Sequence, residues 1–305
     1  MAYRKPSAWG YTKRIVRQIW HHPSNRHRRV RAVVGAITWQ IRKRVTHRAR
    51  DIAFHGWILR GYPDSNSASN VIYFTEWFDP LEMAFMASYL RPGDGFADVG
   101  ANIGTYSLLA RSIVGPTGHV DGFEPSSVAA ARFRENVELN RIDNVTIHQA
   151  AVGATTGSAE FLVGFDVSNR VASAQDPGWA TVSVPVVRLD DALDDRPFAL
   201  GKLDVEGNEL AALQGAEAHL RRADPPVWQV EILENQLEQA GTTSEALRGL
   251  LHDHGFSLAV YEPDRSEMRY LGPDDPHPPN VWAVHESAIE QVAERLAPGH
   301  AATKS

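Results

Sequence analysis

The stretch FADVGANIGTYSLLA, residues 96–110, places an acid and two glycines where a buried strand gives way to a helix. Its apolar start is typical of a core strand in a parallel sheet, and the run from Thr105 is typical of a helix. Gly100 and Gly104 permit a tight turn and let a ligand approach the backbone closely. The stretch therefore predicts a strand, a turn and a helix that form one wall of a small-molecule site.

Downstream, apolar runs alternate with helical patterns, as expected for a parallel sheet with crossover helices. Core strands are predicted at 95–99, 119–125, 144–153, 201–207 and 225–232, helices at 81–90, 105–113, 126–140, 209–222 and 244–254, an antiparallel insertion at 159–164 and 180–189, and a final antiparallel pair at 256–263 and 280–285. This pattern predicts an α/β fold: a mostly parallel seven-stranded sheet with helices on both faces, preceded by a basic helical N-terminal arm.

Three segments are expected along the chain. The turn-rich stretch GYPDSNSASN, residues 61–70, marks the boundary between a basic arm with its linker, 1–70, and a ligand-binding domain, 71–298. Residues 299–305 are expected to be a disordered tail.

Polar residues gather where the predicted parallel strands end, and ligands of open α/β sheets bind at those carboxyl ends. In chain order they are Asp98, Gly100, Asn102 and Gly104, then Glu124 and Pro125, then Gln149 and Ala150, then Asp204 and Glu206, and finally Glu231. The sheet is therefore expected to bring these residues to one rim.

The rim does not carry the dinucleotide fingerprint. A G-x-G-x-x-G motif starting at Gly100 would need glycines at Asn102 and Thr105, which disfavours an NAD-dependent oxidoreductase. Glu124 lies at the end of the next strand, where a carboxylate can accept from both hydroxyls of a ribose. Acids near the turn repel phosphate and suit a cation. S-adenosylmethionine fits these demands because it has a ribose diol, an ammonium, a sulfonium and no phosphate.

The sequence resembles the FkbM-type S-adenosylmethionine-dependent methyltransferases over about residues 77–283. The similarity lies in FADVGANIGTYSLLA, VDGFEPSSVAAARFRENVELN, VTIHQAAVG, KLDVEGNELAALQGAEAHL and VWQVEI, in this order. The resemblance implies a class I methyltransferase fold and methylation of a hydroxyl on a sugar or natural product. It also implies that Asp98, Gly100, Ala101, Asn102, Gly104 and Thr105 line the methionine end of the cofactor, that Glu124 and Pro125 lie at the ribose, and that Gln149 and Ala150 flank the adenine.

Methylation of an alcohol calls for a general base, because a protonated hydroxyl is a poor nucleophile. Asp204, Glu206 and Glu231 are the candidates, since they converge at adjacent strand ends. The same carboxylates are alternatively ligands of a divalent cation, which prefers hard oxygen donors, or contacts of the cofactor.

The N-terminal arm is strongly basic. Residues 1–60 hold 15 Lys and Arg but a single acid, Asp51, whereas the whole chain has a net charge of −6. Valine and isoleucine recur at helical spacing between Val30 and Val45. Either this helix packs on the acidic body, or it meets an anionic membrane or an acidic partner. No nucleic-acid-binding motif accompanies the charge, and no segment is long enough to cross a bilayer.

Other functions stay open at this point. They are N-methylation of an amine or peptide, and a non-catalytic nucleoside-binding module recruited by its arm. The absence of cysteine excludes disulfides and thiolate sites, and no metal site is predicted from histidine and acid spacing. The protein is expected in the cytoplasm or at a membrane surface, and the oligomeric state is not predicted.

Overall fold

The computed structural model of the protein describes residues 8–74, 76–162, 170–172, 178–193, 196–272 and 275–297, with side chains from Arg14 onward. The chain divides into two compact units, Met1–Pro80 and Leu81–Ser305. The predicted boundary after residue 70 falls within helix α3 (Asn66–Phe74). The predicted tail at 299–305 lies outside the described residues.

The first unit combines helices with a β-hairpin. Its elements are α1 (Ala8–His21), the 3-10 helix η1 (Pro23–Asn25), α2 (Arg29–Val45), β1 (Arg50–Phe54), β2 (Trp57–Gly61) and α3. The expected helices are present, and the hairpin is an element that the sequence pattern did not predict. His55 and Gly56 both have positive φ, which a tight two-residue hairpin turn requires. The stretch 61–70 was predicted as a break, and α3 begins inside it.

The core of the first unit is small and centres on Trp39. Trp39 is fully buried with Ile19 and Tyr73, and its Nε1 donates to Ser69 Oγ at 3.1 Å. The buried amide of Asn25 donates to the carbonyls of Ile19 and Tyr73, at 2.9 and 2.8 Å. These bonds tie the chain between α1 and α2 to the end of α3.

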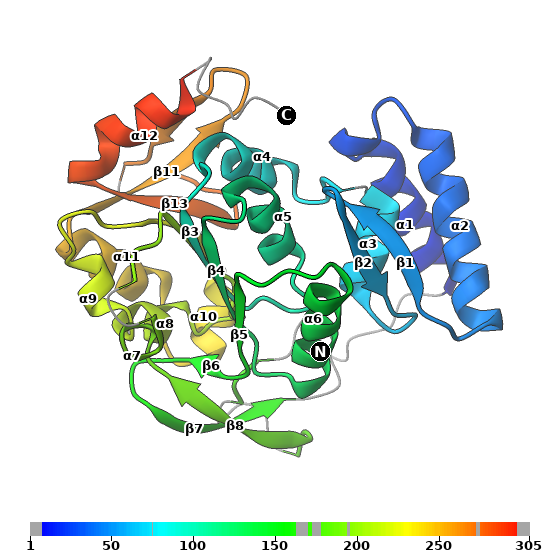
Figure 1. The fold of residues 1–305 in the computed structure, drawn as a ribbon, viewed down its shortest axis with the longest axis horizontal. Coiled ribbons are helices and arrows are strands. Elements are labelled where there is room, and N and C mark those ends of the chain that lie inside the picture. The colour runs from blue at the N-terminus through cyan, green and yellow to red at the C-terminus, as the bar shows by residue number, and fades with distance from the viewer. Residues whose placement is uncertain are drawn as a thin grey trace. The chain divides into compact units, whose positions relative to one another are not determined.

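The second unit is built on a large twisted sheet (Figure 1). Within the described residues its order is β12-β11-β13-β10-β9-β3-β4-β5, and the neighbours from β10 to β5 run parallel. The strands are β3 (Gly95–Val99), β4 (His119–Phe123), β5 (Val145–His148), β9 (Leu200–Leu203), β10 (Val227–Glu231), β11 (Phe256–Glu262), β12 (Glu267–Tyr270) and β13 (Asn280–His285). The α/β fold is confirmed. An eighth strand adds to the predicted seven because β12 is a four-residue edge strand, too short for its sequence pattern to show.

Helices cover both faces of this sheet, with α4, α5 and α6 on one side and α8, α9 and α11 on the other (Figure 1). Their bounds are α4 (Pro80–Tyr89), α5 (Thr105–Val114), α6 (Ser127–Leu139), α7 (Leu189–Leu193), α8 (Glu209–Gln214), α9 (Glu217–Leu220), α10 (Glu234–Gln239), α11 (Ser244–Asp253) and α12 (Ile289–Leu296). The helix predicted over 209–222 is broken between Gln214 and Glu217. A Cβ on Gly215 would lie 2.2 Å from the carbonyl oxygen of Gly153, so the backbones meet there too closely for another residue.

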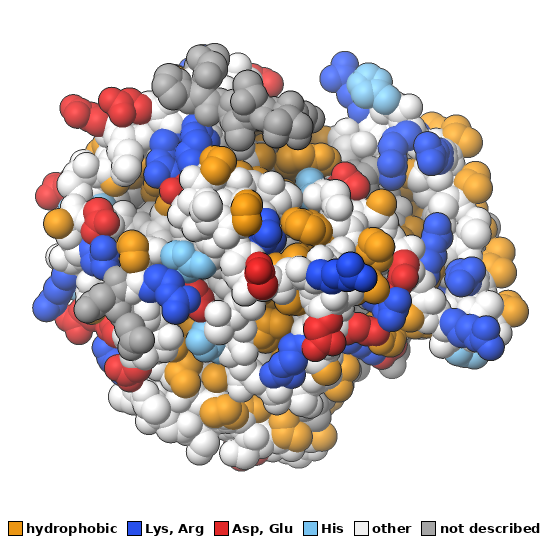
Figure 2. All heavy atoms as spheres, viewed as in Figure 1, with side chains coloured by type: hydrophobic (Ala, Val, Ile, Leu, Met, Phe, Trp, Pro, Cys, Tyr) orange, Lys and Arg blue, Asp and Glu red, His pale blue; other side chains and the backbone are white. Residues whose placement is uncertain are grey.

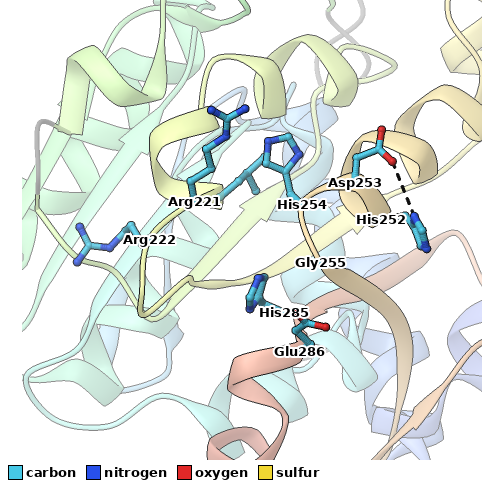
Figure 3. Close-up of a pocket in the computed structure, with 9 residues that line it drawn as sticks. Arg221, Arg222, His252, Asp253, His254, Gly255, His285 and Glu286 are labelled. Atoms are coloured by element: carbon cyan, nitrogen blue, oxygen red, sulfur yellow. Dashed lines mark ion pairs between the residues drawn. The ribbon is translucent and has the colours of Figure 1, made fainter.

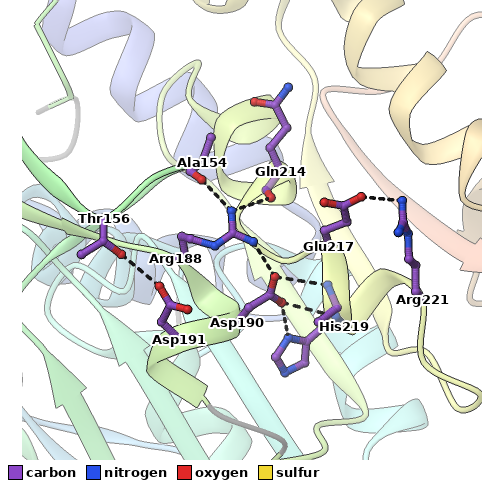
Figure 4. A network of polar contacts seen from close by, with 10 residues as sticks. Ala154, Thr156, Arg188, Asp190, Asp191, Gln214, Glu217, His219 and Arg221 are labelled. Carbon is purple, nitrogen blue, oxygen red and sulfur yellow. Dashed lines mark hydrogen bonds and ion pairs between the residues drawn. The ribbon is translucent and has the colours of Figure 1, made fainter.

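A smaller sheet of the order β6-β8-β7 follows β5, with β6 (Ala151–Val152), β7 (Gly157–Leu162) and β8 (Thr181–Val187). The predicted third strand, 144–153, is therefore two strands in two sheets. The guanidinium of Arg188 anchors the small sheet, donating to the Ala154 carbonyl at 2.7 Å and to Asp190 at 2.8 Å (Figure 4). Asp190 also contacts Nδ1 of His219 on α9 at 2.9 Å. This network fixes the insertion to the helices after β8 and β9.

Packing between α6 and the sheet depends on the absence of a side chain at Gly122. A methyl group there would lie 2.4 Å from the ring of Phe133, so Gly122→Ala should lower the free energy of unfolding by about 1–3 kcal/mol. Gly249 is exposed inside α11 with nothing within 4 Å, so Gly249→Ala should instead raise it by about 0.5–1 kcal/mol. Urea unfolding followed by circular dichroism measures both. Changes of equal sign would contradict this packing.

Candidate active site

The turn after β3 is shaped by contacts that exclude side chains. Gly100 has φ +87°, and a Cβ there would lie 1.9 Å from the Asp204 carbonyl oxygen at the end of β9. Gly104 has φ +84°, and a Cβ there would lie 2.2 Å from the Phe133 ring. Asn102 between them also has positive φ, at 50°. The turn is therefore held tightly against the neighbouring strand end and α6.

Glu124 joins this turn to the end of β4. Its carboxylate is buried and accepts the backbone N–H of Asn102 on Oε2 at 2.9 Å and that of Ser126 on Oε1 at 2.8 Å. Burial raises the pKa of Glu124 to about 7, against the two N–H groups, which favour the ionised form. Glu124 thus accepts a backbone N–H at the start of α6, and its carboxylate has further lone pairs that could accept from a ligand hydroxyl.

Asp98 lies beneath the turn. It is completely buried, and its Oδ2 accepts from Ser107 Oγ of α5 at 2.6 Å. Its Oδ1 is buried with no hydrogen-bond partner among the described residues. Burial raises the pKa of Asp98, while Lys202 and Ser107 oppose the rise. A buried acceptor without a donor costs free energy, so an N–H or O–H that reached it would be bound favourably.

Lys202 is a residue of the site that the sequence analysis missed. It lies beside Asp98 in the register of β3 and β9, and it is buried. Its Nζ donates to Asp204 Oδ2 at 2.9 Å and lies 4.9 Å from the ring centre of Tyr106. Burial lowers the pKa of Lys202, but Asp204, Asp98 and Glu231 outweigh that effect and raise it. The available signal was a lysine inside an otherwise apolar parallel strand, where charge is rare unless paired.

The carboxylates predicted as bases surround this lysine. Burial, Asp204 and Glu206 raise the pKa of Glu231 to about 8, and burial with Asp204 raises that of Glu206 to about 7. Glu206, with φ +55°, accepts a hydrogen bond from Gln236 Nε2 of α10. Oε2 of Glu231 is buried without a hydrogen-bond partner in the described part of the chain. The structure therefore brings Asp204, Glu206 and Glu231 into one electrostatic cluster, which we call the acid cluster.

Glu209 adjoins the acid cluster in a structural role. Its Oε1 accepts the N–H of Val205 at 3.0 Å and of Gly207 at 3.2 Å, which closes the loop between β9 and α8. Burial raises its pKa to about 7. Its position in the first turn of α8 accounts for this residue without a catalytic function.

The remaining predicted residues fall into two groups. Ala101, Thr105 and Ala150 are buried, so they offer little exposed surface to a ligand in this conformation. Pro125 is half-buried, directly after Glu124. Gln149 is exposed, and its Oε1 accepts from Arg134 Nη2 of α6 at 2.9 Å, away from the acid cluster.

Metal binding finds no support in the described residues, among which no group of three or more His, Asp and Glu is arranged to hold an ion. The ammonium of Lys202 is a cation of the protein's own within the acid cluster, 2.9 Å from Asp204.

A hollow of about 810 Å³ lies elsewhere, beside the start of β11 (Figure 3). Its cationic side chains already have acidic neighbours: Arg221 lies 2.5 Å from Glu217 and Arg222 2.9 Å from Asp224. His252 and Asp253, 3.8 Å apart, are both exposed. β11 is antiparallel to β13 and β13 to β10, so β11 runs in the same direction as the parallel strands. Because Gly255 precedes β11, this hollow lies at the amino ends of the parallel strands. It is therefore separate from the acid cluster at their carboxyl ends.

The rim can hold a particular kind of ligand. Its acids would repel phosphate, whereas the buried acceptors on Asp98 and Glu231 match a ligand that carries positive charge. Glu124 matches a diol. The strand order changes direction at β3, from which the parallel strands continue on both sides, and the glycine turn follows β3 at this switch point. These two features define a nucleoside-binding α/β protein of the class I methyltransferase type.

Comparison with known proteins identifies the family. The model of the methyltransferase FkbM domain family matches residues 98–258, more than half of the chain. A relative from Streptomyces tacrolimicus, 31-O-demethyl-FK506 methyltransferase FkbM, is 31% identical over 206 residues, covering 56% of this chain and 75% of the relative. Methyltransferase 1 of Beauveria bassiana (strain ARSEF 2860) is 29% identical over 198 residues, covering 57% of this chain and 76% of the relative. The chain belongs to the FkbM methyltransferase family and is an S-adenosylmethionine-dependent methyltransferase.

Solved structures are more distant. Methyltransferase FkbM of Methylobacillus flagellatus KT is similar with a TM-score of 0.41 at 17% identity, covering 84% of this chain and 59% of that one. A score of this size does not establish the fold, which rests on the strand order above and the family match.

The acid cluster makes stability depend on pH. Glu231 titrates at about 8 in the folded protein and at its ordinary value of 4.5 when unfolded, so the folded state binds the extra proton between these pH values. The carboxyl therefore destabilises the fold increasingly as the pH rises from 4.5 to about 8. Glu231→Gln should be more stable than the wild type by up to a few kcal/mol at about pH 8.5, and about equal to it near pH 4. Urea titrations at both pH values measure this, and a difference independent of pH would contradict it.

Proposed function

We propose that the protein methylates a hydroxyl oxygen on a small metabolite, a sugar or a natural product. The observation that carries the proposal is the cluster of Asp204, Glu206 and Glu231 beside the glycine turn, since an alcohol needs a base before it can attack. The relative from Streptomyces tacrolimicus supports the choice of oxygen, because its name gives an O-demethylated compound as its substrate.

The cofactor is proposed to lie across the ends of β3 and β4. Glu124 would accept from the ribose hydroxyls, as its remaining lone pairs allow. The backbone from Gly100 to Thr105 would line the methionine end, above the buried Oδ1 of Asp98. Ala150 and Gln149 would flank the adenine, and for this the side chain of Gln149 would give up its hydrogen bond with Arg134.

When bound, S-adenosylmethionine supplies a methyl group on a positive sulfur, and transfer to oxygen leaves a neutral thioether. The protein's part is to place the hydroxyl in line and to take its proton. Glu206 is the proposed base, because its pKa of about 7 lies where a base is half ionised at neutral pH. The hydroxyl proton passes to the carboxylate as the new oxygen–carbon bond forms.

Lys202 is proposed to act through its neighbours. Its raised pKa keeps it a cation, so it is not a base. Its ammonium holds Asp204 at 2.9 Å and moderates the pKa of Glu206 and Glu231 by attraction. Lys202 is therefore a positioning residue that fixes the charge of the acid cluster.

The ribose role of Glu124 can be measured directly. Glu124→Gln keeps an oxygen for one backbone N–H but loses the charge, so its dissociation constant for S-adenosylmethionine should rise about 10–100-fold. Glu217→Gln, at a paired surface carboxylate, should bind as the wild type does. Isothermal titration calorimetry compares the three proteins. Unchanged affinity in Glu124→Gln would reject the ribose role.

The reaction itself is tested with matched acceptors. The wild type should add a methyl group to hydroxylated metabolites and not to the corresponding amines, read by mass spectrometry. Glu206→Gln should lower kcat about 10²–10⁴-fold while changing cofactor affinity little, since it removes the proton acceptor. Preference for amines would replace O-methylation by N-methylation. Cofactor binding with no product from either panel would favour a binding module.

A further inference from the structure

Helix α2 has two apolar faces, and only one of them is used in folding. Ala32, Ala36 and Trp39 are buried against Ile19 of α1 and Tyr73 of α3. The two alanines let the helices approach closely, and the indole fills the space between them. The face that packs is therefore not the valine and isoleucine face suggested by the sequence.

Val33 also packs against this core, and the other five valines and isoleucines of α2 form the opposite face. The exposed fraction is 67% for Val30, 56% for Val34, 51% for Ile37, 58% for Ile41 and 73% for Val45. We call these five residues the outer stripe. They follow one another at intervals of three or four residues and so share one side of the helix, over a length of about 22 Å. Figure 2 shows hydrophobic side chains along the outer edge of α2, with Lys and Arg side chains beside them.

Arginines border the outer stripe on both sides. At 100° per residue, Arg31 and Arg42 flank one side and Arg44 the other, whereas Arg29 lies about 120° round the helix from the middle of the stripe; all four are exposed. Residues 1–50 contain no acid, and the first one, Asp51, is paired with Arg60 at 2.8 Å. α2 therefore has no acid of its own to neutralise the positive charge around the stripe.

Trp20 of α1 is an exposed aromatic beside the first turn of α2. Its ring is 39% exposed and lies 5.9 Å from the Arg29 guanidinium carbon. An indole beside exposed arginine is typical of side chains at a membrane interface.

An apolar stripe with arginines on both sides matches an anionic bilayer in both chemistry and shape. Acyl chains accept the stripe, while lipid phosphates and carboxylates meet the guanidinium groups. A second copy of α2 would bring the same arginines together, and a nucleic acid would leave the stripe without an apolar partner. Within the described residues no helix has the length and apolarity to span a membrane.

We propose that the outer stripe of α2 inserts into the interface of an anionic membrane, with Arg31, Arg42 and Arg44 bound to lipid headgroups. This peripheral attachment is independent of the proposed acceptor chemistry, because no residue of the acid cluster takes part.

Vesicle sedimentation of the full chain tests the proposal. The protein should bind vesicles of phosphatidylcholine with about 30% phosphatidylserine at least 10-fold better than phosphatidylcholine alone, in about 0.1 M NaCl. Raising the salt to about 0.5 M should weaken binding, because screening shortens the reach of the arginines. Ile37→Glu/Ile41→Glu should reduce binding more than 10-fold, since it removes two inserting side chains and adds like charge to that of the lipid.

Val128→Glu is the matched control, an exposed valine of α6 outside the first unit, 57% exposed. It should bind vesicles as the wild type does. All the changed side chains are exposed, so circular dichroism and urea midpoints should stay unchanged. Binding that ignores lipid charge, or that survives Ile37→Glu/Ile41→Glu, would overturn the proposal. So would a dimer in analytical ultracentrifugation that this double variant dissociates, in a protein that does not bind vesicles.

Discussion

The ion pair between the buried ammonium of Lys202 and the carboxylate of Asp204 is the interaction on which the site depends. A buried charge is tolerated only when it is paired, and Lys202 lies in register with Asp98 and beside Glu231 as well. One cation is thus shared by several acids. Burial, together with the negative charge of neighbouring acids, raises the pKa values of Glu206 and Glu231. A cationic ligand suits such a cluster.

The backbone around this pair is as constrained as the charges. Gly100 meets the carbonyl of Asp204 so closely that no side chain fits, which locks the end of β3 to the end of β9. Glu124, at the end of β4, is linked to the turn after β3 because its carboxylate accepts the Asn102 N–H. Three neighbouring strand ends are therefore fixed relative to one another before any ligand arrives, and preorganisation of this kind is what a methyl transfer needs for in-line geometry.

Local patterns were sufficient for the parallel strands, their helices and the acids at the rim, because periodicity and glycine turns act over a few residues. They were insufficient where contacts between residues far apart in the sequence determine which side chains are buried or paired. The sequence shows Lys202 as a charged residue in an apolar strand, but its role is apparent only when the structure places Asp98 and Asp204 beside it. In α2 the spacing of Val30 to Val45 predicts a helix, but the packing of Trp39 determines which side is buried. The hairpin β1–β2 and the edge strand β12 are too short for their patterns to stand out.

The central claim is that the acid cluster around Lys202 receives a positively charged nucleoside. Calorimetric titration near pH 7, in two buffers of different ionisation enthalpy, counts the protons released on binding. Because Glu206 and Glu231 have pKa values of about 7 and 8, a cation beside them should expel up to about one proton. S-adenosylmethionine should therefore release more protons than S-adenosylhomocysteine, which lacks the charge on sulfur. Equal release by both ligands, or none, would contradict the account.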